Sequence, residues 1–199
     1  MRKNSRKSSR RVQRRNSHLL TYLLAGGLVV VLMVVVILVV QSGTQTPPAV
    51  ALMGTPVPIL SRDHIPSDQN PNPYNSSPPA GGHHFDNPLP AKFYNESDAA
   101  AVGKYPEGYL VHSLEHGYVI FWYNCAVPGT DCAALKQSIQ NVMNQYGGTK
   151  LIAFPWPSLT VPLAMSSWGQ VMNFPKVDEA LMGKFVQTNR YQSPEPNGE

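Results

Sequence analysis

Near its N-terminus the chain contains an unbroken apolar run. Residues 19–40 include no charged side chain and consist mainly of Leu, Val and Ile, and eight Lys or Arg residues lie among the fifteen that open the sequence. A transmembrane helix needs about 20 apolar residues, whereas the apolar region of a secretory signal has about 7 to 15. We therefore predict an uncleaved transmembrane helix over residues 19–41, with cleavage near Ala49-Val50-Ala51 as the alternative.

The charge distribution predicts how this helix is oriented. Lys and Arg residues beside a first span remain on the cytoplasmic side, so we expect residues 1–18 to form a basic cytoplasmic tail and the rest of the chain to lie outside the plasma membrane. Membrane lipid is then the partner of residues 19–41. Eight of the sixteen Lys and Arg residues lie in the tail. Residues 41–199 therefore contain eight Lys or Arg and twelve Asp or Glu, which gives this part a net charge of −4. A nucleic-acid-binding domain needs a basic face, so we expect no nucleic acid partner, and the sequence names no protein partner.

The distribution of proline predicts the domain organisation. Nine prolines lie between residues 47 and 79, where they exclude regular helix and central strand. We predict a Pro-rich linker over residues 42–58, one extracytoplasmic domain over residues 59–192 and a disordered tail over residues 193–199. A domain of that length has room for one modest core.

Hydrophobic periodicity predicts a small α/β (α+β) sandwich. Strands are predicted over residues 110–114, 118–123, 151–154 and 161–165, the first two joined by a tight connection that contains Gly117. Helices are predicted from Thr130 or Asp131 to Tyr146 and over residues 177–187. After Gly117 the predicted order is strand, helix, strand, strand, helix. The first two of these strands are joined by a helix that crosses over the sheet, so we expect them to be parallel. The order is similar to the second half of a thioredoxin-like fold.

The segment His112-Ser113-Leu114-Glu115-His116 is the strongest candidate for a functional site. On a helix, residues four apart share a face, so the two imidazoles would bind one ion and Glu115 would act as a base, as in metal-dependent hydrolases. On a strand, the two histidines would still share a face, but Glu115 would point away. Pro106, Gly108 and Gly117 favour the strand, which leaves metal binding open and disfavours the hydrolase.

Three further histidines precede this motif. His83 and His84 are adjacent, and neighbours on an extended chain point in opposite directions, so at most one of them joins His112 and His116. A set of His84 or His83 with His112, His116 and Glu115 would suit zinc or copper, which both bind imidazole. The alternative is a structural network in which the rings hydrogen-bond to loop carbonyls.

His64 and Tyr74 are candidate ligand-binding residues, because a plain spacer does not need these residue types. They lie in the Pro-rich segment that precedes the other histidines. We expect this segment to form an irregular arm over the domain.

The two cysteines, Cys125 and Cys132, lie in the part that we expect to be exported. Six residues that include Pro128-Gly129 separate them. Nearby thiols in an oxidising compartment usually pair, so we predict a structural disulfide.

Three segments resemble a known family. They are Tyr74 with Pro78-Pro79-Ala80-Gly81-Gly82-His83-His84, then Val111-His112-Ser113-Leu114-Glu115-His116-Gly117, and finally Ala164-Met165-Ser166-Ser167-Trp168-Gly169. The family is that of bacterial and archaeal membrane-anchored proteins known as domain of unknown function 3105, and the resemblance covers about residues 60–195. It implies a single N-terminal anchor and a compact extracytoplasmic domain. It also favours His84 over His83 as a site residue.

Three functions are compatible with these residues. The first is a membrane-anchored domain that binds a metal ion or a small ligand through the histidines without turnover. The second is a metal-dependent hydrolase with Glu115 as the base. The third is a protein-interaction module in which the histidines are structural.

Overall fold

The computed structural model describes residues 22–38 and 51–198, and it divides into two units, Met1–Ala49 and Val50–Glu199. In the first unit, residues 22–38 form a helix with exposed side chains. No helix among the described residues is both long enough and apolar enough to cross a membrane. The predicted basic tail, the two ends of the predicted span and the first part of the predicted linker lie outside the described residues.

A five-stranded mixed sheet forms the centre of the second unit. Its strands are β1 (Thr55–Pro56), β2 (Val119–Tyr123), β3 (Leu151–Pro155), β4 (Leu163–Ser167) and β5 (Gln170–Phe174). The spatial order is β1-β5-β4-β2-β3. The predicted parallel pairing is confirmed for β2 and β3, and the other neighbouring strands are antiparallel.

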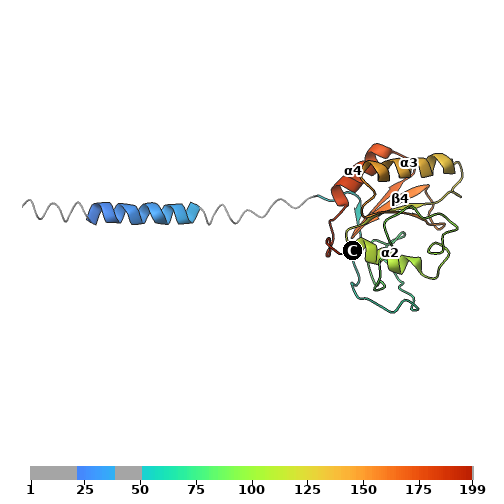
Figure 1. The fold of residues 1–199 in the computed structure, drawn as a ribbon, viewed down its shortest axis with the longest axis horizontal. Helices are drawn as coiled ribbons and strands as arrows, with labels where there is room; N and C mark the ends of the chain where they lie inside the picture. Colours follow the sequence, from blue (N-terminus) through green and yellow to red (C-terminus); the bar gives the residue numbers. More distant parts are fainter. Residues whose placement is uncertain (1–21, 39–50, 199) are drawn as a thin grey trace, which may run out of the picture. The chain divides into compact units, whose positions relative to one another are not determined.

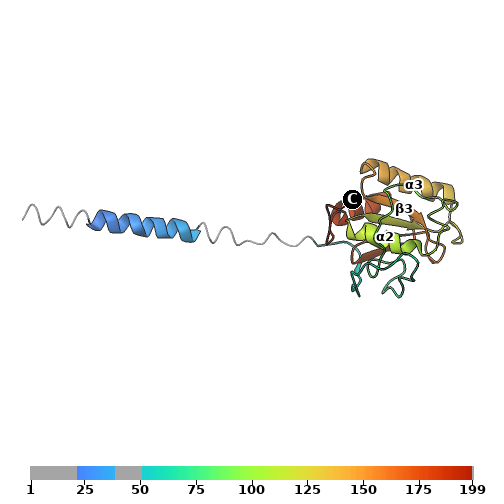
Figure 2. The same cartoon turned by 60° about the horizontal axis from the view of Figure 1, so that its bottom comes forward.

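Three helices cover the sheet: α2 (Pro106–Glu115), α3 (Cys132–Gln145) and α4 (Glu179–Asn189). Helices α3 and α4 lie on one side of the sheet and α2 lies on the other, as two views of the fold show (Figures 1 and 2). The α+β class predicted from the sequence is therefore confirmed. Each of the two predicted helices also begins where a side chain caps it: Asp131 accepts from the Ala134 N–H at 3.1 Å, and Asp178 accepts from the Leu181 N–H at 2.9 Å.

Strand β2 contributes to two hydrophobic cores, one on each side of the sheet. Val119, Phe121 and Tyr123 pack under α3 and α4, whereas Ile120 and Trp122 pack towards α2. This alternation follows from the two-residue period of a strand. All five residues are buried because both faces of the sheet are covered.

The predicted strand over residues 110–114 is wrong, because these residues lie in α2. Leu110, Val111 and Leu114 fall at helical spacing and pack against the sheet. Short apolar runs such as this one do not distinguish a strand from a buried helix by pattern alone. Pro106 stands at the first turn of the helix, where proline is tolerated, and Gly117 with φ 81° lets the chain turn directly into β2.

Strands β1 and β5 were not predicted from the sequence. Trp168-Gly169 is the turn that joins β4 to β5, and Gly169 has the left-handed φ of 71° that such a turn requires. The helical and strand segments that follow β2 otherwise agree with the prediction to within a few residues. The predicted disulfide between Cys125 and Cys132 is confirmed, and it links the end of β2 to the first residue of α3.

Candidate metal centre

The C-terminal half of α2 carries three of the candidate residues. His112 and Glu115 are 4 % exposed, and His116 caps the helix, its N–H donating to the His112 carbonyl at 3.1 Å. Because the segment is helical, Glu115 lies on the same side of the domain as the arm histidines, contrary to the prediction from a strand. The ten-residue helix contains Pro106 and Gly108, which were expected to favour a strand.

The irregular segment over residues 60–90, here called the arm, brings two more histidines to α2. His64 and His84 form an isolated parallel β-bridge, with Ile65 N–H donating to the His84 carbonyl at 2.8 Å and His84 N–H donating to the Asp63 carbonyl at 3.2 Å. The Phe85 N–H then donates to the Gly108 carbonyl at 3.1 Å, which attaches the arm to the helix. Residues distant in sequence are thereby held side by side through backbone hydrogen bonds.

His64, His84 and His112 form a group that could hold a metal ion. One ring nitrogen from each lies within 4.8 Å of the nitrogens of the other two. The His64 and His112 rings stack with centroids 5.0 Å apart, and the His84 ring stands edge-on to both. His84 is fully buried, whereas the His64 side chain is 46 % exposed, so the group lies just beneath the surface with His64 on its outer side.

Backbone carbonyls orient the two buried rings. The Nδ1 atom of His84 lies 2.9 Å from the Gly82 carbonyl oxygen, and the Nδ1 atom of His112 lies 2.5 Å from the Phe85 carbonyl oxygen. A carbonyl only accepts, so we assign the proton of each ring to Nδ1. Each Nε2 is then unprotonated, as in the usual metal-binding histidine whose other ring nitrogen donates to a carbonyl.

Glu115 lies beside the group of three and offers an oxygen donor next to two of its members. Its Oε2 atom lies 2.9 Å from His84 Nε2 and 3.8 Å from His64 Nε2. His84 Nε2 is buried and has no hydrogen-bond partner in the described part of the chain. In the assigned tautomer an unprotonated ring nitrogen therefore lies against a carboxylate oxygen without a hydrogen bond between them. A proton or a metal ion shared by the two atoms would make this contact favourable.

Burial sets the protonation state of His112. The pKa of His112 is lowered to about 4, mainly because the ring is removed from water. The hydrogen bond to Phe85 opposes this shift, and the neighbouring histidines His116, His84 and His64 contribute to it. The imidazole is therefore neutral at physiological pH, which is the form that binds metals.

His116 lies beside the group and not within it. Its Nε2 atom is 3.1 Å from His112 Nε2 and 3.5 Å from Glu195 Oε2. The Glu195 N–H donates to the Glu115 carbonyl at 3.1 Å, and Lys150 Nζ donates to the His116 carbonyl at 2.7 Å. The C-terminal segment that contains Glu195, predicted to be a disordered tail, thus contacts the end of α2.

The remaining predicted site residues lie elsewhere. His83 is outside the group of three, and its carbonyl accepts a hydrogen bond from the Tyr74 hydroxyl at 2.9 Å. Asp86, which lies 3.4 Å from His64 Nδ1, was not predicted as a site residue. Glu195 was not predicted either, because neither residue belongs to a recognisable motif. Trp168 belongs to the third segment that resembles the family, and its ring stands edge-on to His84 with centroids 6.3 Å apart.

A second cluster of metal-binding residue types is not comparable. Glu96 lies near Cys125 and Cys132, but the two cysteines are joined in the disulfide. Metals bind the thiolate form of cysteine, so this cluster offers only one ordinary ligand.

Comparison with known proteins connects the histidine site to a family. The sequence pattern described as "Protein of unknown function (DUF3105)" matches residues 64–199. The chain belongs to the DUF3105 family. Two of the segments that carried the resemblance, residues 78–84 and 111–117, supply His84, His112 and Glu115 to the site, and the third, residues 164–169, supplies Trp168. No curated protein and no solved structure matches the chain, so the thioredoxin-like comparison stays a prediction.

Proposed function

We propose that this DUF3105 protein binds a transition-metal ion through His64, His84 and His112, with Glu115 as the fourth donor. The observation that carries this proposal is the contact of 2.9 Å between His84 Nε2 and Glu115 Oε2, two buried atoms that both present electron pairs. Donor atoms that share a tetrahedral zinc ion with bonds of 2.0 to 2.1 Å stand about 3.3 Å apart. The spacing is thus close to that of two ligands of one ion.

The donor set favours zinc or copper. Three imidazoles and one carboxylate are borderline ligands that suit both metals. Magnesium and calcium prefer oxygen donors throughout, and a site for Cu(I) would favour thiolate or thioether ligands. Met165, the nearest methionine in the family motifs, packs instead in the core beneath α3 and α4.

We also propose that residues 19–41 anchor the domain in the plasma membrane with the histidine site outside. The sequence supports this through the charge-free apolar run and the basic residues before it. Protease treatment of intact cells that express the chain tests the orientation. Digestion of the C-terminal domain without lysis is expected, and protection until lysis would contradict it.

The metal content of the full chain tests the binding proposal. The protein is purified in a mild detergent without chelator, and its zinc and copper are measured by mass spectrometry. We expect close to one ion per chain in the parent protein. His84→Asn and His112→Asn should lose it, because the Asn amide can still donate to the Gly82 or Phe85 carbonyl while the Nε2 ligand is gone.

His83→Asn is the matched control for these variants. It changes the same residue type in the same loop but lies outside the group of three, so we expect full metal content. Absence of metal from the parent protein, or equal metal in all variants, would mean that a proton and not a metal ion lies between His84 and Glu115.

A metal-dependent hydrolase is the second candidate, and the helical form of the 112–116 motif favours it. In that case Glu115 would act on a metal-bound water as a general base and would not be a ligand. Glu115→Gln separates the two roles. A ligand role predicts weaker metal binding, whereas a base role predicts retained metal and loss of hydrolysis of a peptide or ester substrate.

A further inference from the structure

A second site lies at the opposite end of α2 from the metal centre. A cavity of about 400 Å³ that opens to the surface is lined by residues of the segment 72–79, by Glu107 at the start of α2 and by Trp156 after β3. Small-ligand sites typically have about 300 to 1,000 Å³. The cavity is therefore large enough for a small organic molecule.

The cavity contains a buried carboxylate in the first turn of α2, where the helix N-terminus favours a negative charge. Glu107 is 8 % exposed, and its Oε1 atom accepts one hydrogen bond from the Asn72 side-chain amide at 3.0 Å. Two carboxylate oxygens can accept about four hydrogen bonds. None of the residues that line the cavity is Lys, Arg or His, so the described residues place a negative charge there without a cation.

Aromatic side chains form part of the wall. Tyr74 and Trp156 both line the cavity. The Trp156 Nε1 atom is buried and finds no acceptor among the described residues, although buried polar groups are nearly always hydrogen-bonded. The Tyr74 hydroxyl already donates to the His83 carbonyl, and burial together with the Glu107 charge raises the pKa of Tyr74, so this wall stays neutral.

These three features describe one ligand chemistry. A buried anion next to aromatic faces attracts an organic ammonium ion through charge and through cation–π contact. The Trp156 indole N–H has no acceptor among the described residues, so an oxygen on the same ligand would add a second point of recognition. We propose that the cavity beside Glu107 binds a small ammonium compound that also carries an oxygen acceptor, such as an amino alcohol.

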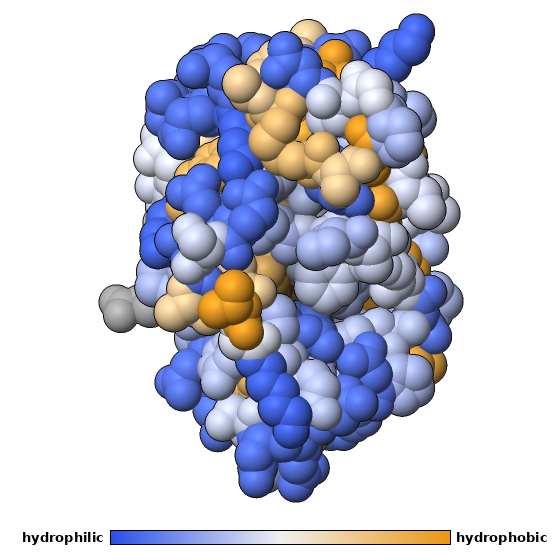
Figure 3. Space-filling view, turned by 90° about the vertical axis from the view of Figure 1, so that its right-hand side faces the viewer, coloured by the Kyte–Doolittle hydropathy of each residue, from blue (hydrophilic) through white to orange (hydrophobic). Residues whose placement is uncertain are grey.

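Other surfaces do not support a comparable inference. A larger cavity of about 690 Å³ lies beside β1 and β5, but no ionisable side chain lines it. The face of the molecule in Figure 3 is mainly hydrophilic and carries apolar residues only in small groups. A docking surface for a partner usually needs a larger continuous apolar patch.

Calorimetric titration of the full chain tests the proposal. Choline and ethanolamine are the probes, in a maltoside detergent that contains no ammonium group. The matched control ligand is 3,3-dimethyl-1-butanol, which has the shape of choline without its charge. We expect saturable binding of at least one probe and binding of the neutral compound at least about tenfold weaker.

Two variants locate the site. Glu107→Gln keeps the acceptor for Asn72 and removes the charge, so binding of the probe should weaken about tenfold or more. Trp156→Phe keeps an aromatic face and removes the indole N–H, so it should weaken binding by a smaller factor. His112→Asn, which alters the metal centre alone, should leave the affinity for the probe unchanged.

Titration of the parent protein can refute the proposal without any variant. If neither probe binds saturably, water satisfies Glu107 and Trp156, and the proposal is overturned. Equal binding of choline and its neutral analogue would also overturn it. If Glu107→Gln does not fold, as judged by thermal unfolding, Glu107→Asp replaces it and should retain binding of the probe. Comparison of free choline with phosphatidylcholine vesicles shows whether the ammonium group belongs to a soluble compound or to a lipid headgroup.

Discussion

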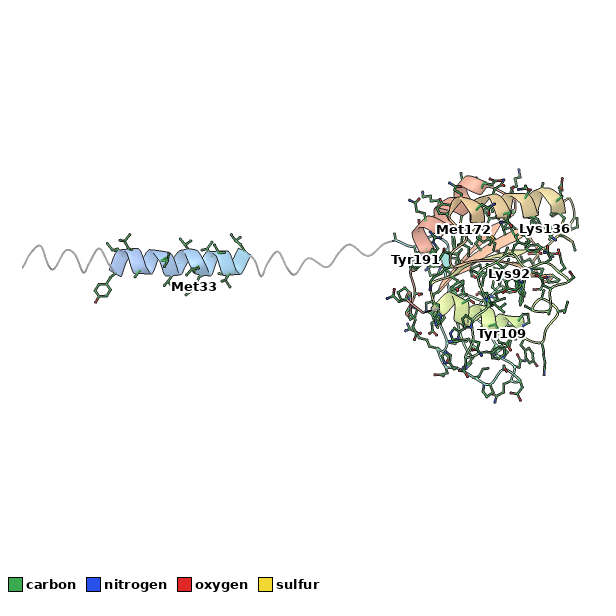
Figure 4. All side chains as sticks on the ribbon, in the orientation of Figure 1. Met33, Lys92, Tyr109, Lys136, Met172 and Tyr191 are labelled. Atoms are coloured by element: carbon green, nitrogen blue, oxygen red, sulfur yellow. A yellow bond between two sulfur atoms is a disulfide. The ribbon has the colours of Figure 1, made fainter. Side chains whose placement is uncertain are left out.

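Replacement of Gly108 by alanine tests how the arm and α2 fit together. A Cβ atom at this position would lie 2.4, 2.5 and 2.7 Å from three ring atoms of Phe85. Phe85 is 1 % exposed, and its ring packs edge-on against Tyr109, with centroids 4.8 Å apart. Tyr109 projects from α2 (Figure 4). The Phe85 ring therefore has little space into which it can move.

Two physical effects of Gly108→Ala have opposite signs. Helix propensity alone favours alanine by about 1 kcal/mol, whereas an extra methyl group in a packed core costs about 1 to 3 kcal/mol. Contacts as short as 2.4 Å with three atoms of a buried ring place this site near the upper end of that range. We expect a net loss of about 1 to 2 kcal/mol in the free energy of unfolding.

The same substitution should weaken metal binding. The Phe85 carbonyl accepts the hydrogen bond from His112 Nδ1, and His84 is the preceding residue. A shift of Phe85 therefore moves a carbonyl that orients one ligand and the backbone of another. Loss of such an orienting partner typically lowers metal affinity about 10- to 100-fold.

Urea denaturation and zinc titration of Gly108→Ala measure both effects. Ala134→Gly is the control, because Ala134 is the third residue of α3 as Gly108 is of α2, and it is exposed. It reports the propensity effect without a clash and should leave zinc affinity unchanged. If Gly108→Ala is as stable as the parent protein and binds zinc equally well, the packing of Phe85 on α2 is not as described.

Three other perturbations have defined outcomes. Zinc at a hundredfold excess over its Kd should add about 2.7 kcal/mol to the free energy of unfolding, which calorimetry would detect as a Tm increase of about 5 to 11 °C. His112→Asn should abolish this increase, and an unchanged Tm in the parent protein would contradict the metal site. Replacement of Cys125 and Cys132 by serine opens a short loop and should cost about 2 to 3 kcal/mol in urea denaturation; no loss would mean that the disulfide does not constrain the unfolded chain. Glu195→Gln alters an exposed contact with the His116 ring, so zinc affinity should fall less than about fivefold, and a larger loss would make Glu195 a ligand.

Local sequence patterns determined much of the C-terminal half of the fold. Helix α3 has its apolar residues at helical spacing and an aspartate cap, and both features depend only on neighbouring residues. The parallel pairing of β2 with β3 follows from the crossover helix between them. The disulfide follows from two cysteines a short distance apart in the chain.

Helix α2 could not be recognised in the same way because it is buried on nearly all sides. Its polar residues His112, Ser113 and Glu115 are as inaccessible as its apolar ones, so the sequence has no amphipathic period there. The arm makes this burial possible: Ser113 Oγ, for example, accepts the Leu89 N–H at 3.0 Å. Contacts with another segment, and not local propensity, decided the conformation.

The sequence by itself determined which residue types this domain can offer to a site, since its most site-like segment contains two histidines and a glutamate and further histidines precede it. Only the tertiary structure decided which residues meet. The β-bridge between His64 and His84 and the docking of Phe85 on Gly108 join segments that lie tens of residues apart. These contacts also separate His84 from its neighbour His83 and turn Glu115 towards the imidazoles. Such long-range placement depends on how side chains fill the space between α2 and the arm, and no local pattern records it.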